Sequence, residues 1–153
     1  MRIIKSLLAL CILIGLGSTQ VFGQEYVYVC NQNSASISII NVETLEVEET
    51  INLQDLGFSS NAKPHHTAVE PDGSFWYVTL IGENRVLKFN AENELIGQTE
   101  MEVPGLISLH QTENVMYVGR SMSAVNPPSS FGVISRSEME LTNEVDLLFA
   151  RPH

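Results

Sequence analysis

Apolar residues occur in short runs between residues 26 and 148, and polar turns separate these runs. The runs are rich in β-branched and aromatic residues, which favour strands. The turns, such as Pro71-Asp72-Gly73 and Gly82-Glu83-Asn84, contain residues that tolerate the backbone dihedral angles of tight connections. The pattern therefore predicts strands at residues 26–30, 36–40, 45–53, 65–70, 75–80, 85–90, 95–103, 106–110, 115–119, 131–135 and 141–148.

The order of residues repeats along the chain. Lys63-Pro64-His65 opens a stretch that leads to Trp76-Tyr77-Val78. Forty residues later, Val103-Pro104-Gly105 leads with the same spacing to Met116-Tyr117-Val118. The same opening occurs a third time at Arg151-Pro152-His153.

A second alignment relates the N-terminal part of the chain to the middle part. A shift of 49 positions places residues 28–31 on 77–80 and residues 37–41 on 86–90. The two alignments together divide the chain into units at about 26–53, 64–103 and 104–149, with the start of the next unit at 151.

A period of forty to fifty residues made of short strands is typical of a β-propeller, in which each repeat is one small sheet of a ring. One such sheet cannot bury both of its faces alone and needs neighbours. The first unit matches strands two to four of the second unit and lacks strand one. We therefore expect an all-β fold, a β-propeller of four-stranded antiparallel blades, of which this chain holds an incomplete portion of about two and a half blades.

Three segments resemble the bacterial repeat family named for the sequence Tyr-Val-Thr-Asn: Tyr28-Val29-Cys30-Asn31, Tyr77-Val78-Thr79-Leu80 and residues 64–73. The resemblance covers residues 26–153 and implies a secreted or periplasmic propeller with seven blades. Related propellers include the haem-binding domain of periplasmic nitrite reductase, the copper-bearing domain of nitrous-oxide reductase, and sugar lactonases. The chain departs from the repeat at Gly105, where a second Pro-His is expected, and in the insertion at residues 121–130.

Residues 1–23 have the pattern of a secretory signal peptide. Arg2 and Lys5 give a basic start, residues 6–17 form an apolar stretch, and Val21-Phe22-Gly23 offers small residues for cleavage before Gln24. The apolar stretch is shorter than the roughly twenty residues that cross a bilayer, so no membrane span is expected after cleavage. The pattern predicts export to the periplasm or the extracellular space, with residues 24–153 as the partial propeller domain.

The charge balance excludes some classes of partner. The chain carries 8 basic and 18 acidic residues, a net charge of −10, and removal of Arg2 and Lys5 makes the mature charge more negative. An acidic surface repels phosphate backbones and anionic lipids, so neither nucleic acid nor a membrane surface is an expected partner.

Cysteine usage adds little to the prediction. Cys11 leaves with the signal peptide, so Cys30 has no disulfide partner within the chain. Cys30 lies in an apolar run, where a buried and unreactive thiol is expected. The question whether sequence beyond this chain supplies a disulfide partner for Cys30 stays open.

His65 and His153 occupy the same repeat position, 88 residues apart, and are expected on one circle around the mouth of the central channel. Imidazoles arranged in this way can ligate copper, zinc or haem iron. The alternative is a structural role, with ring nitrogens bonded to the backbone of the neighbouring blade. His66 adds to such a site only where the backbone turns, because successive strand residues point to opposite faces. His110 lies at the far end of its strand and is not expected to share a ligand with His65.

The strand order places several loops on one face of the disc: residues 31–34, 63–66, 82–84, 103–105, 120–130 and 151–153. On this face we expect Asn84 and Arg120 beside the histidines. Arg120 begins a loop that Asn126-Pro127-Pro128 stiffens. A cation on a stiff loop suits the recognition of an anionic group. The alternative is an ordinary exposed arginine without such a role. Glu83 is the carboxylate that the repeat places near the histidines.

The sequence supports three functions for this face, which we call the loop face. The first is an exported binding module that recognises a small molecule, a surface polymer or a protein. The second is a periplasmic redox propeller that holds copper or haem through His65 and His153. The third is a lactonase-like hydrolase. No cofactor is evident from the sequence, and neither a nucleophile elbow nor a dinucleotide fingerprint occurs in it.

Overall fold

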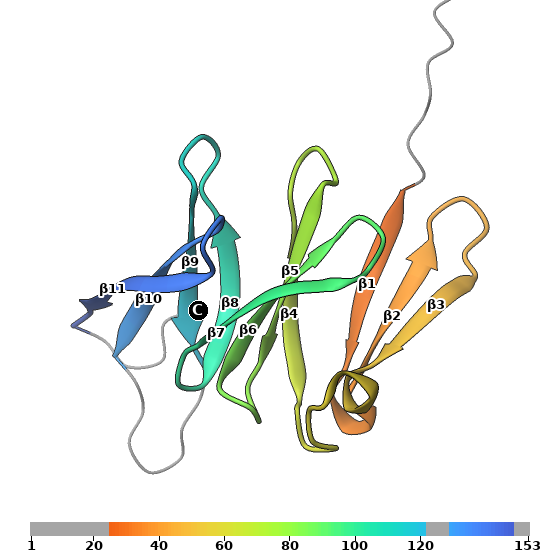
Figure 1. Cartoon of the computed structure of the whole chain (residues 1–153), viewed down its shortest axis with the longest axis horizontal. Helices are drawn as coiled ribbons and strands as arrows, with labels where there is room; N and C mark the ends of the chain where they lie inside the picture. The colour runs from red at the N-terminus through yellow and green to blue at the C-terminus, as the bar shows by residue number, and fades with distance from the viewer. Residues whose placement is uncertain (1–24, 122–128, 149–153) are drawn as a thin grey trace, which may run out of the picture.

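The computed structural model describes residues 25–121 and 129–148, which form three antiparallel sheets side by side (Figure 1). Blade 1 is a three-stranded sheet, and blades 2 and 3 each have four strands in chain order. The strands are β1 (Tyr26–Asn31), β2 (Ser36–Asn41) and β3 (Val47–Asn52) in blade 1; β4 (Pro64–Val69), β5 (Phe75–Leu80), β6 (Arg85–Asn90) and β7 (Leu95–Glu100) in blade 2; and β8 (Pro104–Leu109), β9 (Val115–Arg120), β10 (Ser130–Ser135) and β11 (Glu140–Asp146) in blade 3.

The predicted fold class is confirmed: the described residues form an all-β arrangement of antiparallel blades that fits an incomplete propeller. Blade 1 lacks the strand that would correspond to β4, as the alignment of the repeats predicts. Two short 3₁₀ helices, η1 (Gln32–Ser34) and η2 (Leu53–Leu56), lie in connections that the sequence pattern treats as turn or strand.

The third strand begins later than predicted. Leu45 has a φ of 60° and is 78% exposed, so it belongs to the turn before β3. The backbone amide of Leu45 donates to the carbonyl of Asn41 at 2.9 Å, which closes this turn. Strand β3 therefore starts at Val47, where extended backbone resumes.

Irregularities of the strands recur at equivalent positions in each blade. Between the third and fourth strands of the repeat, the register shifts at Ile39/Ile40, Lys88/Phe89 and Val133/Ile134. Between the first and second strands it shifts after Pro64 and after Pro104. Because a bulge changes the direction of the bulged strand, its repetition gives each blade the same curvature.

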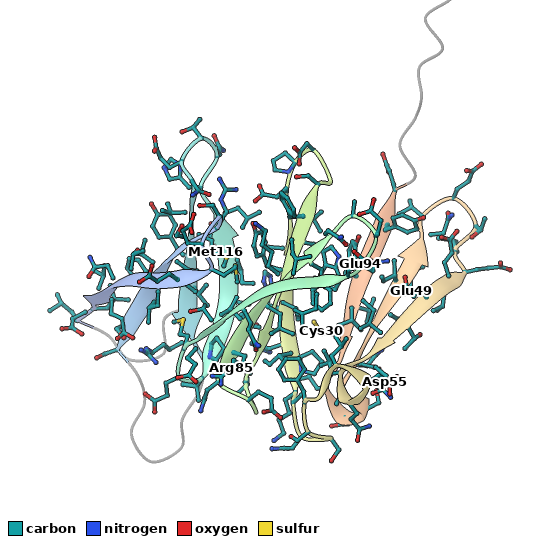
Figure 2. All side chains as sticks on the ribbon, viewed as in Figure 1. Cys30, Glu49, Asp55, Arg85, Glu94 and Met116 are labelled. Atoms are coloured by element: carbon teal, nitrogen blue, oxygen red, sulfur yellow. The ribbon has the colours of Figure 1, made fainter. Side chains whose placement is uncertain are left out.

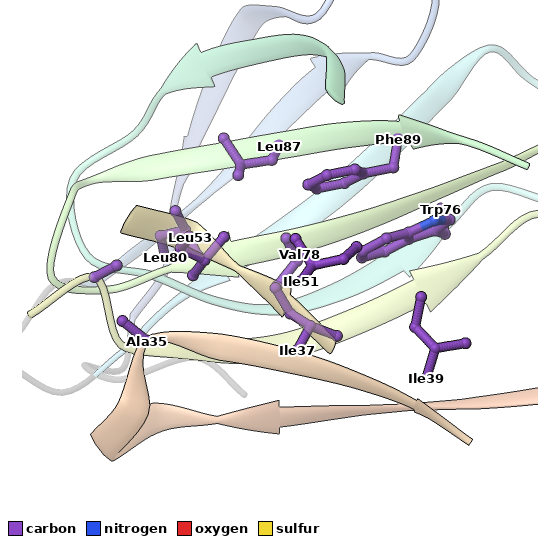
Figure 3. Packing of buried hydrophobic residues seen from close by; sticks show 11 residues of the cluster. Ala35, Ile37, Ile39, Ile51, Leu53, Trp76, Val78, Leu80, Leu87 and Phe89 are labelled. Carbon is purple, nitrogen blue, oxygen red and sulfur yellow. The ribbon is translucent and has the colours of Figure 1, made fainter. Parts of the chain in front are cut away.

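Blades 1 and 2 bury an apolar core between their facing sides (Figure 3). Trp76 stacks on Phe89 with ring centroids 4.2 Å apart, and Tyr28 of blade 1 lies 4.7 Å from Trp76. Ile37 and Ile39 of β2 pack against the same rings from the opposite side. Trp76 and Phe89 of this core are among the largest fully buried side chains of the described residues.

Blades 2 and 3 bury a second core. Successive residues of a strand point to opposite faces, so Trp76 faces blade 1 while its neighbour Tyr77 faces blade 3. Tyr77 packs with residues of both blades, and the members of the core are Tyr77, Val86, Met101, Ile107, Met116, Val118, Ile134 and Met139. Strand β5 therefore contributes to both cores.

A polar network connects blades 2 and 3 at the end opposite the loop face. Glu70 accepts a hydrogen bond from the Tyr77 hydroxyl at 2.9 Å, and its second oxygen pairs with Arg136 at 2.6 Å. The Lys88 ammonium donates to the Arg136 carbonyl at 2.7 Å and lies 4.1 Å from the centroid of the Phe75 ring. Burial lowers the pKa of Lys88 and raises that of Tyr77. The pairing of Glu70 with Arg136 lets this charged cluster lie between two blades.

Replacement of Trp76 tests the first core. Trp76→Ala removes both aromatic contacts and leaves a large cavity, so we expect a loss of about 3–5 kcal/mol in the free energy of unfolding. Leu148→Ala, at a side chain that is 96% exposed, is the matched control and should change stability by less than about 0.5 kcal/mol. Urea unfolding followed by circular dichroism measures both. Equal stabilities of the two variants would contradict the core assignment.

Candidate functional site

The connections at the lower edge of Figure 1 form the loop face of the molecule. The amide of Gly82 donates to the carbonyl of Ala62 at 3.0 Å, and the amide of Ile81 donates to the carbonyl of Lys63 at 3.2 Å. A Cβ atom on Gly82 would lie 1.7 Å from the carbonyl oxygen of Asn61, so only glycine allows this approach. The β5–β6 turn and the crossover from blade 1 to blade 2 are thereby held together.

His65 and His66 both lie in the bulge at the start of β4, where Pro64 pairs with Leu80 and Thr67 pairs with Val78. Two residues of β4 lie opposite Thr79, as in a bulge. The two histidines nevertheless contact different neighbours, His66 the amide of Ile107 in blade 3 and His65 the side chain of Gln32 beside blade 1. The bulge therefore does not bring both rings into one site.

His66 connects blade 2 to blade 3. Its Nδ1 accepts a hydrogen bond from the backbone amide of Ile107 at 3.1 Å, and its own amide donates to Thr79 Oγ1 at 3.2 Å. The Thr79 hydroxyl in turn donates to the carbonyl of Gly105 at 2.8 Å. Burial, together with the neighbouring His65, lowers the pKa of His66, which favours the neutral ring that can accept this bond.

His65 connects blade 2 to blade 1. Its Nδ1 lies 3.0 Å from the side-chain amide nitrogen of Gln32, in the short helix η1. His153, its predicted counterpart, lies outside the described residues. Gly105, which takes the His65 position in blade 3, sits against the backbone of Gly119–Ser121, where a Cβ atom would lie 3.1 Å from the amide nitrogen of Ser121. A side chain at this position would therefore need the neighbouring backbone to shift by a few tenths of an ångström.

Asn84 closes the β5–β6 turn and joins it to the crossover into blade 3. It has a φ of 54°, in the left-handed region that asparagine tolerates. Its side-chain oxygen accepts from the amide of Val103 at 2.9 Å, and its carbonyl accepts from the amide of Met101 at 3.0 Å. The side chain lies on the loop face, with its oxygen committed to the backbone.

Arg120 is not the exposed, anion-binding cation that the sequence suggested. It ends β9 with a side chain only 7% exposed. Its guanidinium pairs with the carboxylate of Glu144 and donates to the Glu102 carbonyl at 2.6 Å and to Ser130 Oγ at 2.9 Å. The Glu102 carboxylate lies 3.6 Å away. Two carboxylates already balance this charge, so the guanidinium is occupied.

A polar groove of about 600 Å³ lies on the loop face between blades 2 and 3. Asn84 and Arg120 both line it, whereas His65 and His66 are not among its lining residues. Arg85 and Glu100 pair across one wall at 2.7 Å, and Figure 2 shows Arg85 near this end of blade 2. The lining residues are Glu83, Asn84, Arg85, Glu100, Met101, Glu102, Arg120, Leu141 and Glu144.

Glu83 does not contact the histidines that it was predicted to accompany. Its carboxylate accepts hydrogen bonds from both the backbone amide and the hydroxyl of Ser59. These bonds lower the pKa of Glu83, so the carboxylate is ionised at neutral pH. Glu83 thus adds a fixed negative charge to the groove.

Other predicted groups lie elsewhere. His110 Nδ1 accepts from the amides of Thr112 and Glu113 in the β8–β9 turn, away from the loop face. Cys30 packs against the first core, and burial raises the pKa of its thiol to about 11. Within residues 25–121 and 129–148, no three His, Cys, Asp or Glu side chains are grouped closely enough to hold a metal ion.

Sequence reasoning placed Glu83 on the loop face but missed the other acidic residues of the groove, Glu100, Glu102 and Glu144. Glu100 and Glu102 lie on either side of Met101, so one sequence segment carries two of the carboxylates. Glu144 comes from β11, and the pairing of β9, β10 and β11 within blade 3 brings it to Arg120. The weak signal available beforehand was the excess of acidic over basic residues.

The pH dependence of stability tests the role of His66. The pKa of His66 in the folded chain lies below the unfolded value of about 6.5, so the unfolded state binds more protons between the two values. The free energy of unfolding should therefore fall as pH drops from 7 through 6.5 and below. His66→Asn keeps a side-chain acceptor that does not titrate, so its stability should fall less over this range. Urea unfolding at several pH values measures the difference, and parallel curves would argue against this role.

Arg120 and Leu80 occupy equivalent repeat positions, each paired with the proline that begins its blade. Arg120→Ala leaves buried polar partners without a donor, and we expect a loss of about 1–3 kcal/mol in the free energy of unfolding. Arg120→Leu restores the residue type of blade 2 and fills part of the volume, so it should be the more stable of the two variants. Thermal melting compares them. A leucine variant less stable than the alanine variant would show that leucine does not fit the volume left by the arginine.

Neither a protein-family model nor a curated protein matches the chain. Solved structures do match it. Hydrazine synthase of Kuenenia stuttgartiensis aligns with a TM-score of 0.69 and 20% identity, over 83% of this chain and 34% of that chain. The WD40 repeats of RRP9 align with a TM-score of 0.67 and 12% identity, over 82% and 36%.

A third solved structure is a catalytically inactive H270A virginiamycin B lyase from Staphylococcus aureus with quinupristin. It aligns with a TM-score of 0.62 and 16% identity, over 82% of this chain and 39% of that chain. The chain thus spans little more than a third of the length of these structures. WD40 repeats form propeller blades, so the matches support the propeller fold that the three sheets display.

Proposed function

We propose that this chain is part of an exported β-propeller that binds a polar ligand in the groove between blades 2 and 3. The observation that carries the proposal is the groove itself: about 600 Å³ of polar surface on the loop face, between two blades that are rigidly packed. Propellers can present loops from several blades to one ligand, and a rigid scaffold lowers the cost of ordering such loops on binding.

The charges of the groove select the ligand chemistry. Four glutamates and two arginines line it, and Arg120 is already paired with Glu144 while Arg85 is paired with Glu100. The remaining carboxylate oxygens accept hydrogen bonds, so a ligand that carries amino or hydroxyl groups fits them. An anionic ligand would meet a net negative wall. A hydroxyl-rich or amino-bearing surface polymer is therefore the ligand class we favour.

Export is the second part of the proposal. It is supported by the basic start, the apolar stretch and the small residues before Gln24 within residues 1–23. In the part of the chain that the structure describes, no helix is long and apolar enough to cross a membrane. The repeat motifs at Tyr28 and Tyr77 support a relation to the Tyr-Val-Thr-Asn propellers, whose members are secreted or periplasmic.

The redox alternative would use His65 and His153 to hold copper or haem. Nδ1 of His65 lies 3.0 Å from the side-chain nitrogen of Gln32, so a metal at Nδ1 would have to displace this contact. The lactonase-like alternative is supported by the fold alone. One of the similar structures is an enzyme, but it is a lyase. The groove gives the binding function a physical basis that these alternatives lack.

Three soluble oligosaccharides of similar size test the proposed ligand class: a chitosan tetramer, cellotetraose and a galacturonate tetramer. We expect affinity to decrease in that order, because the first carries amines and the last carries carboxylates. In the double variant Glu100→Gln/Glu102→Gln, affinity for the chitosan tetramer should fall roughly tenfold, as a lost charge-assisted hydrogen bond of about 1.5 kcal/mol would cause. Isothermal titration calorimetry measures the affinity of each protein variant for each oligosaccharide.

The matched control is Glu92→Gln, the same chemical change in the β6–β7 turn at the other end of blade 2. It should leave the affinity unchanged. Tightest binding of the galacturonate tetramer, or an equal loss in the control and in the double variant, would contradict a ligand site in this groove.

A further inference from the structure

Lys88 is a buried charge at a position that is apolar in the other two blades. In each blade, one residue of the third strand of the repeat pairs with the tyrosine of the second strand. That residue is Ile39 in blade 1 and Val133 in blade 3, whereas in blade 2 it is Lys88, which pairs with Tyr77. Lys88 is only 8% exposed, and Ile39 belongs to the first core. The blade fold does not need a charge at this position, and a residue that breaks the pattern of its repeat points to a function.

The contacts of Lys88 leave its charge without a paired carboxylate. Its ammonium donates to the carbonyl of Arg136 at 2.7 Å and lies 4.1 Å from the centroid of the Phe75 ring. Among the described residues Lys88 forms no ion pair, and the carboxylate of Glu70 is already paired with Arg136. Burial is the main influence on the pKa of Lys88 and lowers it, Glu70 and Glu138 raise it, and Arg136 lowers it further. A buried ammonium is costly unless an anion lies close to it, so this group favours an anionic partner.

Lys88 lines a groove of about 420 Å³ at the end of the molecule opposite the loop face. The turns at the upper edge of Figure 1 form this end. Pro71 and Asp72 of the β4–β5 turn line one side of the groove, and Asn114 and Arg136 of blade 3 line the other. Because blades 2 and 3 both contribute, the groove lies within the chain, between two blades that pack on each other. Its volume is in the range of pockets that hold a small molecule.

The side chains of this groove differ from those of the groove on the loop face. Two cations and two carboxylates line it, whereas four glutamates and two arginines line the other. Asp72 lies exposed in its turn and accepts hydrogen bonds from the amide and the hydroxyl of Ser74 at 3.0 Å and 2.7 Å. Phe75 and Pro71 add apolar surface beside Lys88. The groove thus combines a cation that lacks a paired carboxylate with an apolar wall.

From this arrangement we propose that the groove between blades 2 and 3 binds a small molecule that joins a carboxylate to an aromatic or other apolar body. The carboxylate accepts a charge-assisted hydrogen bond from the ammonium of Lys88, which has three donors and uses one of them on Arg136. The body of the molecule lies against Phe75 and Pro71. The net negative charge of the chain opposes an anion at long range, but salt screens such charges beyond about 8 Å under physiological conditions and screens a buried contact much less.

Three probes of similar size test the proposal on the full wild-type chain. Phenylacetate, phenylacetamide and phenethylamine share one ring and differ in the charge at the end of the side chain. We expect phenylacetate to bind with a dissociation constant below about 5 mM, as the affinity per atom of small ligands allows, and the other two roughly tenfold more weakly. Titration followed by NMR measures the affinities and locates the site through shifts of the amides of Ser74, Asn114 and Ser137, which line the groove.

Two lysine variants test the role of Lys88. Lys88→Met keeps the length of the side chain and removes its charge, so phenylacetate should bind about tenfold more weakly, as the loss of a charge-assisted hydrogen bond would cause. Its melting temperature should equal or exceed that of the wild type, because an apolar side chain replaces a buried charge. Lys63→Met, at an exposed lysine of the loop face, is the matched control with the same net charge, and it should bind as the wild type does.

Several outcomes would overturn the proposal. Weaker binding of phenylacetate than about 5 mM, or equal affinity for the neutral or cationic probe, would show that the groove does not select a carboxylate. Amide shifts confined to the loop face would place the site elsewhere. Unchanged affinity of Lys88→Met together with a lower melting temperature would show that Lys88 has a structural role only. The probe series uses the wild-type chain, so it decides the question even if Lys88→Met does not fold.

Discussion

The packing of one sheet face against the next is the interaction on which the rest of this structure depends. A small antiparallel sheet has two faces, and each blade here must bury one or both against a neighbour. Strand β5 shows how closely this couples the blades: Trp76 enters the first core and the adjacent Tyr77 enters the second. A slip of one residue in the register of β5 would exchange these rings between the cores, so both cores select the same register.

The polar residues at the blade boundaries follow from this packing. His66 bonds blade 2 to blade 3, Asn84 bonds the β5–β6 turn to the crossover between these blades, and Arg120 bonds blade 3 to the same crossover. Each uses a side-chain atom to satisfy a backbone group. The groove on the loop face is the space left between the same two blades. Its shape therefore depends on how the second core packs these two blades together.

The acidic composition determines the chemistry of the groove on the loop face. Carboxylates line the groove and make it a surface that accepts hydrogen bonds. The same excess of negative charge repels anionic ligands from this groove.

The sequence by itself determined the strands, the repeat and the blade organisation, because side-chain alternation and turn residues are local properties that recur with the period of the fold. It also identified Asn84 and Arg120 as residues of the loop face. Only the tertiary structure decided what those residues do. His66 meets Ile107, 41 positions away, through a contact that depends on how blade 2 packs on blade 3. Arg120 meets Glu144, 24 positions away, because β9, β10 and β11 pair side by side within blade 3. The spacing of the repeat places a side chain at a boundary between blades, but the identity of its partner depends on the face of the next sheet that packs against it.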